Sequence, residues 1–165
     1  MAVTTDILAA WRGPARFLRA KRAEGVSEPQ ILVLMLLACF LIFVARWPAL
    51  SRSVELARQT GGPDAPGLQA ILGVTFFATM FMLPLVLYIL AGLSHLVARP
   101  FGGAGSFQSA RLALVWALLA VSPATLFHGL AEGLIGPGPT VTGVGLLTGA
   151  AFLWLWIAML MAAES

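Results

Sequence analysis

An apolar run from Gly67 to Ala98 limits what this chain can fold into more than any other feature of its sequence. It stays apolar for about 30 residues, whereas one α-helix needs about 20 to cross a bilayer. Two spans of about 15 residues would each be too short to cross, and no polar turn separates them. The run therefore predicts one long membrane helix, tilted or kinked at Pro84.

The composition of the whole chain agrees with a membrane protein. Of its 165 residues, 59% are hydrophobic and only 10% are charged, and the mean hydropathy is +0.92. Soluble domains carry about 25% charged residues, and a chain of this size cannot hide so much apolar surface from water. The length allows one domain and leaves no room for a separate soluble catalytic module. The excess of arginine over lysine favours a bacterial source.

Further apolar runs extend the same interpretation along the chain. The expected fold is an all-α, polytopic membrane helix bundle of four transmembrane helices, with five as the alternative. An N-terminal interfacial amphipathic helix precedes the bundle. The bundle is expected to fill residues 29–165, with spans at about 29–47, 67–98, 107–130 and 142–162. Loops are expected at 51–66, with a short helix from Ser51 to Arg58 and a break at 61–64, and at 133–142.

Residues 1–28 form a basic amphipathic segment that is expected to be cytoplasmic. Gly13 and Pro14 interrupt it, so the prediction is a short helical turn, a kink, and a helix from Pro14 to about Glu24 that ends at Gly25. One helical face is apolar (Ile7, Trp11, Ala15, Leu18) and a neighbouring face is basic (Arg12, Arg16, Arg19). This pattern is typical of a helix in the membrane interface. The alternative is a solvated tail that only sets the topology.

The distribution of basic residues predicts how the chain is oriented. Four spans place both termini on one side of the membrane. That side carries seven basic residues: Arg12, Arg16, Arg19, Lys21, Arg22, Arg99 and Arg111. The opposite side carries three: Arg46, Arg52 and Arg58. The positive-inside rule therefore predicts cytoplasmic termini in a bacterial inner membrane, although the three arginines of the first loop argue the other way.

Between Pro84 and Pro123 two apolar runs flank a short glycine-rich turn at 99–106. We interpret this stretch as a helical hairpin whose tight cytoplasmic turn brings the second and third spans side by side, with Ser106 as the N-cap of the third. His95 lies one turn before the end of its helix. It is expected to pack at a helix interface or to hydrogen-bond to the turn.

Polar and small residues form one stripe on each of the two hairpin helices. The stripes are Pro84, Tyr88, Ala91 and His95 on the second span, and Arg111, Ser122, Thr125, Gly129 and Glu132 on the third. Such residues usually face other helices, so the stripes predict packing, and a permeation or ligand path is the alternative. His128 and Glu132 are expected to pair at the outer end. The GxxxG spacings Gly129/Gly133 and Gly145/Gly149 favour packing within the bundle over dimerisation.

The chain lacks the residue patterns of known active sites. Cys39, in an apolar run, is the single cysteine of the chain. One cysteine cannot form an intrachain disulfide, and no Cys/His metal spacing surrounds it. The chain contains no Gly-x-Ser-x-Gly, P-loop or His-Glu-x-x-His sequence. No catalytic, cofactor-binding or metal-binding residues are therefore predicted, no cofactor is expected, and nucleic acid is not expected as a partner.

The segment from Leu93 to Pro123 resembles the bacterial branch of the Yip-one domain family, whose members are named for interaction with Ypt/Rab GTPases. The resemblance is carried by a small polar cluster, a GG-x-GSF-like turn, and a following helix with an aromatic residue and a proline: Ser94, His95, Gly102, Gly103, Gly105, Ser106, Phe107, Trp116 and Pro123. It extends over residues 5–160. It implies a multi-pass membrane protein without catalysis. Eukaryotic relatives usually have five spans and act in membrane traffic.

These features together predict a non-enzymatic integral membrane protein that acts as a scaffold or partner-binding, membrane-organising module. The alternative is a small transporter or channel subunit. Expected partners are membrane lipid and another membrane or cytoplasmic protein, and the oligomeric state is open. The candidate structural or interaction residues are Ser94, His95, Arg99, Gly102, Gly103, Gly105, Ser106, Phe107, Arg111, Pro123 and Glu132.

Overall fold

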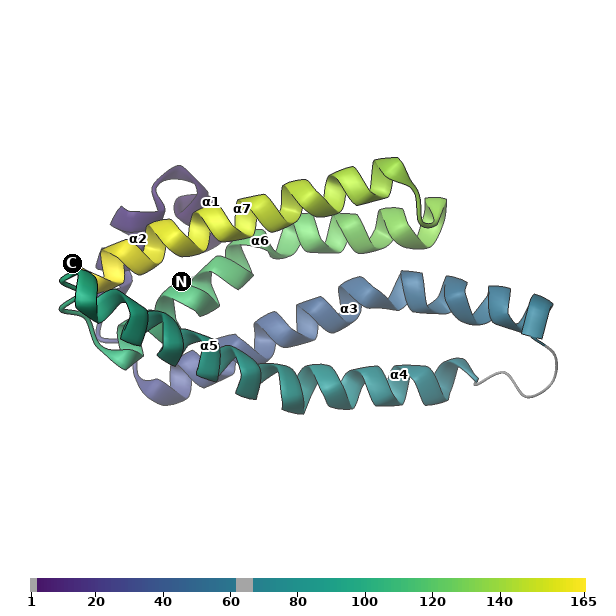
Figure 1. Cartoon of the computed structure of the whole chain (residues 1–165), viewed down its shortest axis with the longest axis horizontal. Helices are drawn as coiled ribbons and strands as arrows, with labels where there is room; N and C mark the ends of the chain where they lie inside the picture. The colour runs from purple at the N-terminus through teal and green to yellow at the C-terminus, as the bar shows by residue number, and fades with distance from the viewer. Residues whose placement is uncertain (1–2, 62–66) are drawn as a thin grey trace.

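The computed structural model describes residues 3–61 and 67–165, and every regular element within these ranges is helical. Figure 1 shows long helices that lie lengthwise in an elongated molecule, with two short N-terminal helices beside one end. The elements are α1 (Val3–Arg12), α2 (Pro14–Ala23), α3 (Glu28–Gly61), α4 (Leu68–Phe77), the π-helical segment η1 (Ala78–Met82), α5 (Leu83–Ala98), the 3₁₀ turn η2 (Arg99–Phe101), α6 (Phe107–Ile135) and α7 (Pro139–Glu164).

Four helical stretches in the described residues are long and apolar enough to cross a membrane. They are Glu28–Thr60, Leu68–Ala98, Phe107–Ile135 and Pro139–Glu164. Many of the large apolar side chains on these helices are exposed on the outside of the bundle, as lipid-facing side chains would be. The all-α, polytopic bundle with four long apolar helices is therefore confirmed.

The stretch from Leu68 to Ala98 forms the single long span that its sequence predicts. The helix is not broken, and its irregular part is the π-helical segment η1, which ends two residues before Pro84. Proline has no N–H to donate, and its ring clashes with the carbonyl one turn earlier. A π-helical turn accommodates both effects.

The helix predicted from Ser51 to Arg58 is present, but the predicted separation from the first span is wrong, because α3 continues without a break through Pro48 to Gly61. Tertiary contacts explain the extension. Pro48 packs against Gly133 of α6, and Nη1 of Arg52 donates to the carbonyls of Gly133 and Leu134 at 3.3 and 3.1 Å. These contacts hold the residues after Pro48 in one continuous helix with the first span. Gly61, the first residue of the break predicted at 61–64, is the last residue of α3, and the rest of that break lies outside the described residues.

The helices around the last turn are also longer than the sequence suggested. α6 runs through Pro123 to Ile135, and α7 begins at Pro139, so the loop expected at 133–142 contains only residues 136–138. Gly136 ends α6 with φ +87°, a conformation that glycine adopts without strain. Pro139 occupies the first turn of α7, where its missing N–H would be unpaired in any case.

α6 is the central helix of the molecule. It packs most extensively on α3 and α7, and also contacts α5 and α1. Glu28 contacts Arg111 near the start of both helices, and Arg52 contacts Gly133 near the end of α6, so α3 and α6 run in the same direction. Gly129 lies directly against the backbone of Ala45, where any side chain would collide. The GxxxG spacing at Gly129/Gly133 therefore allows close packing within the bundle, as predicted.

Candidate functional site

The turn between α5 and α6 is built by local backbone bonds. The N–H of Gly103 donates to the carbonyl of Ala98 at 3.1 Å, and Gly102 adopts φ +90°. Ser106 then caps α6. Its Oγ accepts from the N–H of Ser109 at 3.2 Å, and Ser109 Oγ accepts from the N–H of Ser106 at 2.9 Å. The predicted N-cap is therefore confirmed, in the form of a reciprocal capping box.

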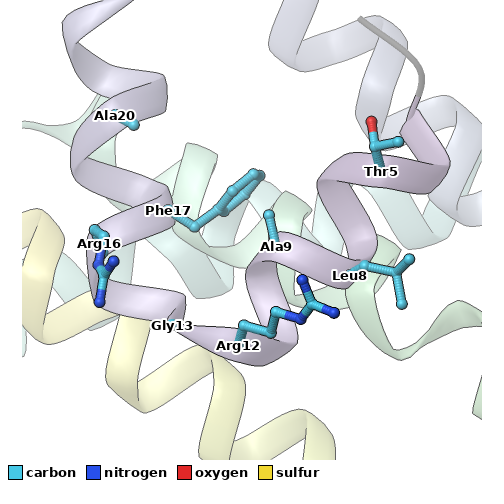
Figure 2. Close-up of a pocket in the computed structure, with 8 residues that line it drawn as sticks. All are labelled: Thr5, Leu8, Ala9, Arg12, Gly13, Arg16, Phe17 and Ala20. Atoms are coloured by element: carbon cyan, nitrogen blue, oxygen red, sulfur yellow. The ribbon is translucent and has the colours of Figure 1, made fainter.

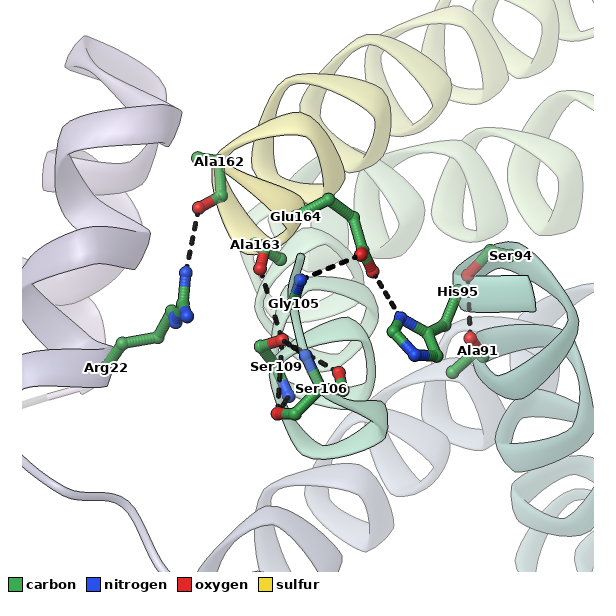
Figure 3. Close-up of polar contacts among 10 residues, drawn as sticks. All are labelled: Arg22, Ala91, Ser94, His95, Gly105, Ser106, Ser109, Ala162, Ala163 and Glu164. Atoms are coloured by element: carbon green, nitrogen blue, oxygen red, sulfur yellow. Dashed lines mark hydrogen bonds and ion pairs between the residues drawn. The ribbon is translucent and has the colours of Figure 1, made fainter. Parts of the chain in front are cut away.

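The last residues of α7 dock into this turn, as Figure 3 shows. The N–H of Ala104 donates to the backbone carbonyl of Glu164 at 2.8 Å, and the N–H of Gly105 donates to its carboxylate Oε2 at 3.3 Å. A Cβ on Gly103 would lie 2.8 Å from that same oxygen. The glycines of the turn therefore allow the close approach of the C-terminal end of α7.

His95 faces the same carboxylate from α5. Its Nδ1 lies 2.8 Å from Oε1 of Glu164, and the side chains of His95 and Glu164 are only 3% and 7% exposed. The His95 ring also packs edge-on against Phe107 of α6, with 4.5 Å between ring centroids. His95 does pack at a helix interface, as expected, but its hydrogen-bond partner lies at the C-terminal end of α7 and not in the turn.

Sequence reasoning missed Glu164 altogether. A signal for it exists in the sequence. Glu164 is an acidic residue at the C-terminal end of an apolar helix, where the helix dipole disfavours negative charge. Such a residue requires a donor or a cation from elsewhere, and His95 is near the same membrane face in the predicted topology. What the sequence does not reveal is that α7 reaches far enough to enter the turn.

The N-terminal segment joins this end of the bundle. Nη1 of Arg22 in α2 donates to the carbonyl of Ala162 at 3.1 Å (Figure 3), and Nε2 of Gln108 donates to the carbonyl of Val26 at 2.8 Å. α2 begins at Pro14 as predicted and ends at Ala23, and Gly25 follows it with φ +72°. α1 is a helix of ten residues and not the short turn that was predicted. α2 packs on α7 and α1 packs on α6. A solvated tail is therefore the wrong alternative.

Lys21, the single lysine of the chain, ties α1 to α2. Its Nζ lies 3.0 Å from Asp6 of α1 and 3.2 Å from Glu24, and above the rings of Phe17 and Trp116. Burial by itself lowers the pKa of Lys21, but hydrogen bonds to Asp6 and Glu24 outweigh it, so the pKa is raised above its usual 10.5. Lys21 thus stays charged and cross-links the two helices.

Other predicted residues of the third span lie outside this cluster. Nη1 of Arg111 donates to Glu28 of α3 at 3.0 Å, and its guanidinium lies 4.9 Å from the ring centroid of Tyr88. Pro123 is exposed further along α6 and Glu132 lies near its far end.

Among the ion pairs of the described residues, none joins His128 to Glu132, so that predicted pair is wrong. His128 instead lies against Gly145 of α7.

The predicted candidate residues therefore divide into two groups. One group gathers at the turn: His95, Arg99, Gly102, Gly103, Gly105, Ser106 and Phe107. Arg99 is exposed there. Ser94 belongs to the same end, but its hydroxyl donates to the carbonyl of Ala91 in its own helix at 2.8 Å. The second group, Arg111, Pro123 and Glu132, is spread along α6.

The fold and this site define a multi-pass helical membrane protein whose N-terminal helices, central turn and C-terminal end are joined at one end of the bundle. The chain matches the family model described as the Yip1 domain over residues 8–164, and it therefore belongs to the Yip1 domain family. No curated protein and no solved structure matches the chain.

Proposed function

We propose that this protein is a non-enzymatic membrane scaffold that presents a docking platform to a cytoplasmic protein. The platform consists of the C-terminal part of α2 from Arg19, the turn at 99–106 and the last turn of α7. The observation that carries the proposal is the insertion of Glu164 into the turn, where it binds both His95 and Gly105. This contact joins the end of α7 to α5 and to the turn before α6, and Arg22 adds α2 to the same assembly. Such a rigid surface is suited to partner binding.

The charge of the platform indicates the kind of partner. Its exposed basic residues are Arg19, Arg22 and Arg99, whereas Glu164, the acidic residue inside it, is buried and hydrogen-bonded. A partner with an acidic surface would be complementary to it, and steering by charge would speed their encounter. The excess of basic residues on this side also supports its assignment to the cytoplasm of a bacterial cell.

The polar stripes provide little support for a transport path. The hydroxyls of Ser122 and Thr125 donate to carbonyls of their own helix, at 2.8 and 3.2 Å. Arg111 is paired with Glu28. These groups are satisfied by local bonds and packing, which is the common role of polar residues in membrane helices.

Site-specific photo-crosslinking in intact membranes tests the scaffold proposal. A photoreactive residue replaces Arg99 or Ala104, both of which are exposed on the platform, or Gln59, which is exposed at the opposite end of α3. The expected result is a discrete protein adduct from the first two positions and none from Gln59. Equal adduct patterns from all three positions, or no protein adduct at Arg99 and Ala104, would overturn the proposal.

A further inference from the structure

The helices α1 and α2 enclose a groove that the proposed docking platform does not use. The groove has a volume of about 520 Å³ and is lined by Thr5, Leu8, Ala9, Arg12, Gly13, Arg16, Phe17 and Ala20. Figure 2 shows Ala9 and Phe17 projecting into the space between the two helices, with Arg12 lying along α1 beside Ala9. The groove is thus apolar along its floor and carries two arginines.

The position of the groove along the bundle limits what can occupy it. Nε1 of Trp11 donates to the carbonyl of Ala120 at 2.8 Å, and its ring lies 6.3 Å from that of Trp154 on α7. At the helical rise per residue, Ala120 lies about 20 Å along α6 from Phe107. The elbow between α1 and α2 therefore lies beside the apolar part of the spans and not beyond their ends.

This position leaves two cations in an unfavourable place. Arg12 and Arg16 are exposed, and within the described part of the chain no carboxylate forms an ion pair with either of them. Asp6, the acidic residue of α1, is already bound to Lys21. An arginine next to hydrocarbon is costly unless it reaches the interface or draws an anion and water toward it. A lipid phosphate from the adjoining headgroup layer is the anion that a bilayer can supply to these arginines.

From these contacts we infer that the groove between α1 and α2 binds an anionic phospholipid of the cytoplasmic leaflet. The lipid phosphate pairs with Arg12, and Arg16 on the facing helix supplies a second positive charge. An acyl chain lies along Leu8, Ala9 and Phe17 in the groove. Leu8, which is 61% exposed, is covered by this chain. The volume is within the usual range of ligand sites, about 300–1,000 Å³.

Lipid crosslinking of the full-length protein in vesicles tests this site. The vesicles contain phosphatidylcholine with a trace of photoreactive phosphatidylglycerol or photoreactive phosphatidylcholine, and the adducts are mapped by mass spectrometry. The expected result is labelling of the peptide that carries Leu8 and Ala9, several-fold stronger with the anionic lipid. Equal labelling by both lipids, or no adduct on α1 and α2, would overturn the inference.

Matched variants separate the charge of the groove from its shape. Arg12→Gln and Arg16→Gln should each lower anionic labelling by about fivefold, as expected for one basic charge near an anionic surface. Arg58→Gln, an exposed arginine at the far end of α3, should leave it unchanged. Ala9→Trp should fill the groove and abolish labelling there while both arginines remain. Each variant is first checked for unchanged helix content and elution. Undiminished labelling in correctly folded Ala9→Trp would contradict the site.

Discussion

The Nδ1 atom of His95 lies 2.8 Å from Oε1 of Glu164, which joins α5 to the last turn of α7 across 69 positions of the chain. The second carboxylate oxygen accepts from Gly105 in the turn. A single carboxylate of α7 therefore contacts both α5 and the turn before α6, at the end of the bundle where the N-terminal segment also attaches. The last turn of α7 is therefore buried in the bundle, with Ala162, Ala163 and Glu164 all shielded from solvent.

Replacing Glu164 by alanine should destabilise the protein by about 1–3 kcal/mol, since His95 and the N–H of Gly105 would lose a buried partner. Glu164→Gln keeps an acceptor in place and should cost less. The measurement is thermal or denaturant unfolding in one detergent. Ser165→Ala, which changes the exposed neighbour, serves as the control. Equal stability of Glu164→Ala and Ser165→Ala would show that the carboxylate contributes nothing to folding.

Replacing Gly105 by alanine should release the C-terminal end of α7 from the turn. The added Cβ would collide with the carbonyl of Ala163 and lie 2.9 Å from the Glu164 carboxylate. Overpacking of this kind costs about 1–3 kcal/mol. Carboxypeptidase digestion measures the effect, because a released end should be trimmed faster than in the parent protein.

Gly149→Ala provides the matched control for that experiment. A Cβ at Gly149 meets no atom within 4 Å, and alanine favours the helix over glycine by about 1 kcal/mol. This variant should digest at the parent rate and unfold no earlier. If both glycine variants behave alike, the close approach at Gly105 has no role in holding α7.

The membrane class, the kinked long span and the Ser106 cap follow from the sequence because each depends on nearby residues. The length of the apolar runs predicts the membrane class, Pro84 predicts the irregular position in the long span, and Ser106, a favoured N-cap residue, predicts the start of α6. The continuity of α3 through Pro48 and the docking of Glu164 depend on contacts between segments far apart in the chain. Local propensity carries no information on such contacts, so neither was predicted.

Cysteine labelling should place the turn and the C-terminus on the same side of the membrane. In a Cys39→Ala background, thiols at Ala104 and Ser165, both exposed, should react with an impermeant reagent only when the cytoplasmic face is accessible. A thiol at Gln59 should react only from the opposite face. Reaction of Ala104→Cys from the outside of intact cells would refute the predicted orientation.

Removing Lys21 should separate α1 from α2 and change how stability depends on pH. Lys21→Met leaves Asp6 without its cation, and the loss should not exceed about 3 kcal/mol, the low end for breaking a buried pair. Asp6 is 15% exposed and so keeps some water. Asp6→Asn in the Lys21→Met background should restore part of the loss, since no uncompensated charge remains.

The sign of the pH effect follows from the raised pKa of Lys21. Folding favours its protonated form, so the stabilisation is fully present below the unfolded value of 10.5 and is lost as pH rises through the folded value. The parent protein should therefore lose more stability above pH 10.5 than Lys21→Met does. Unfolding of both proteins is measured across that alkaline window. Parallel losses would mean that the contacts of Lys21 with Asp6 and Glu24 do not stabilise its charged form.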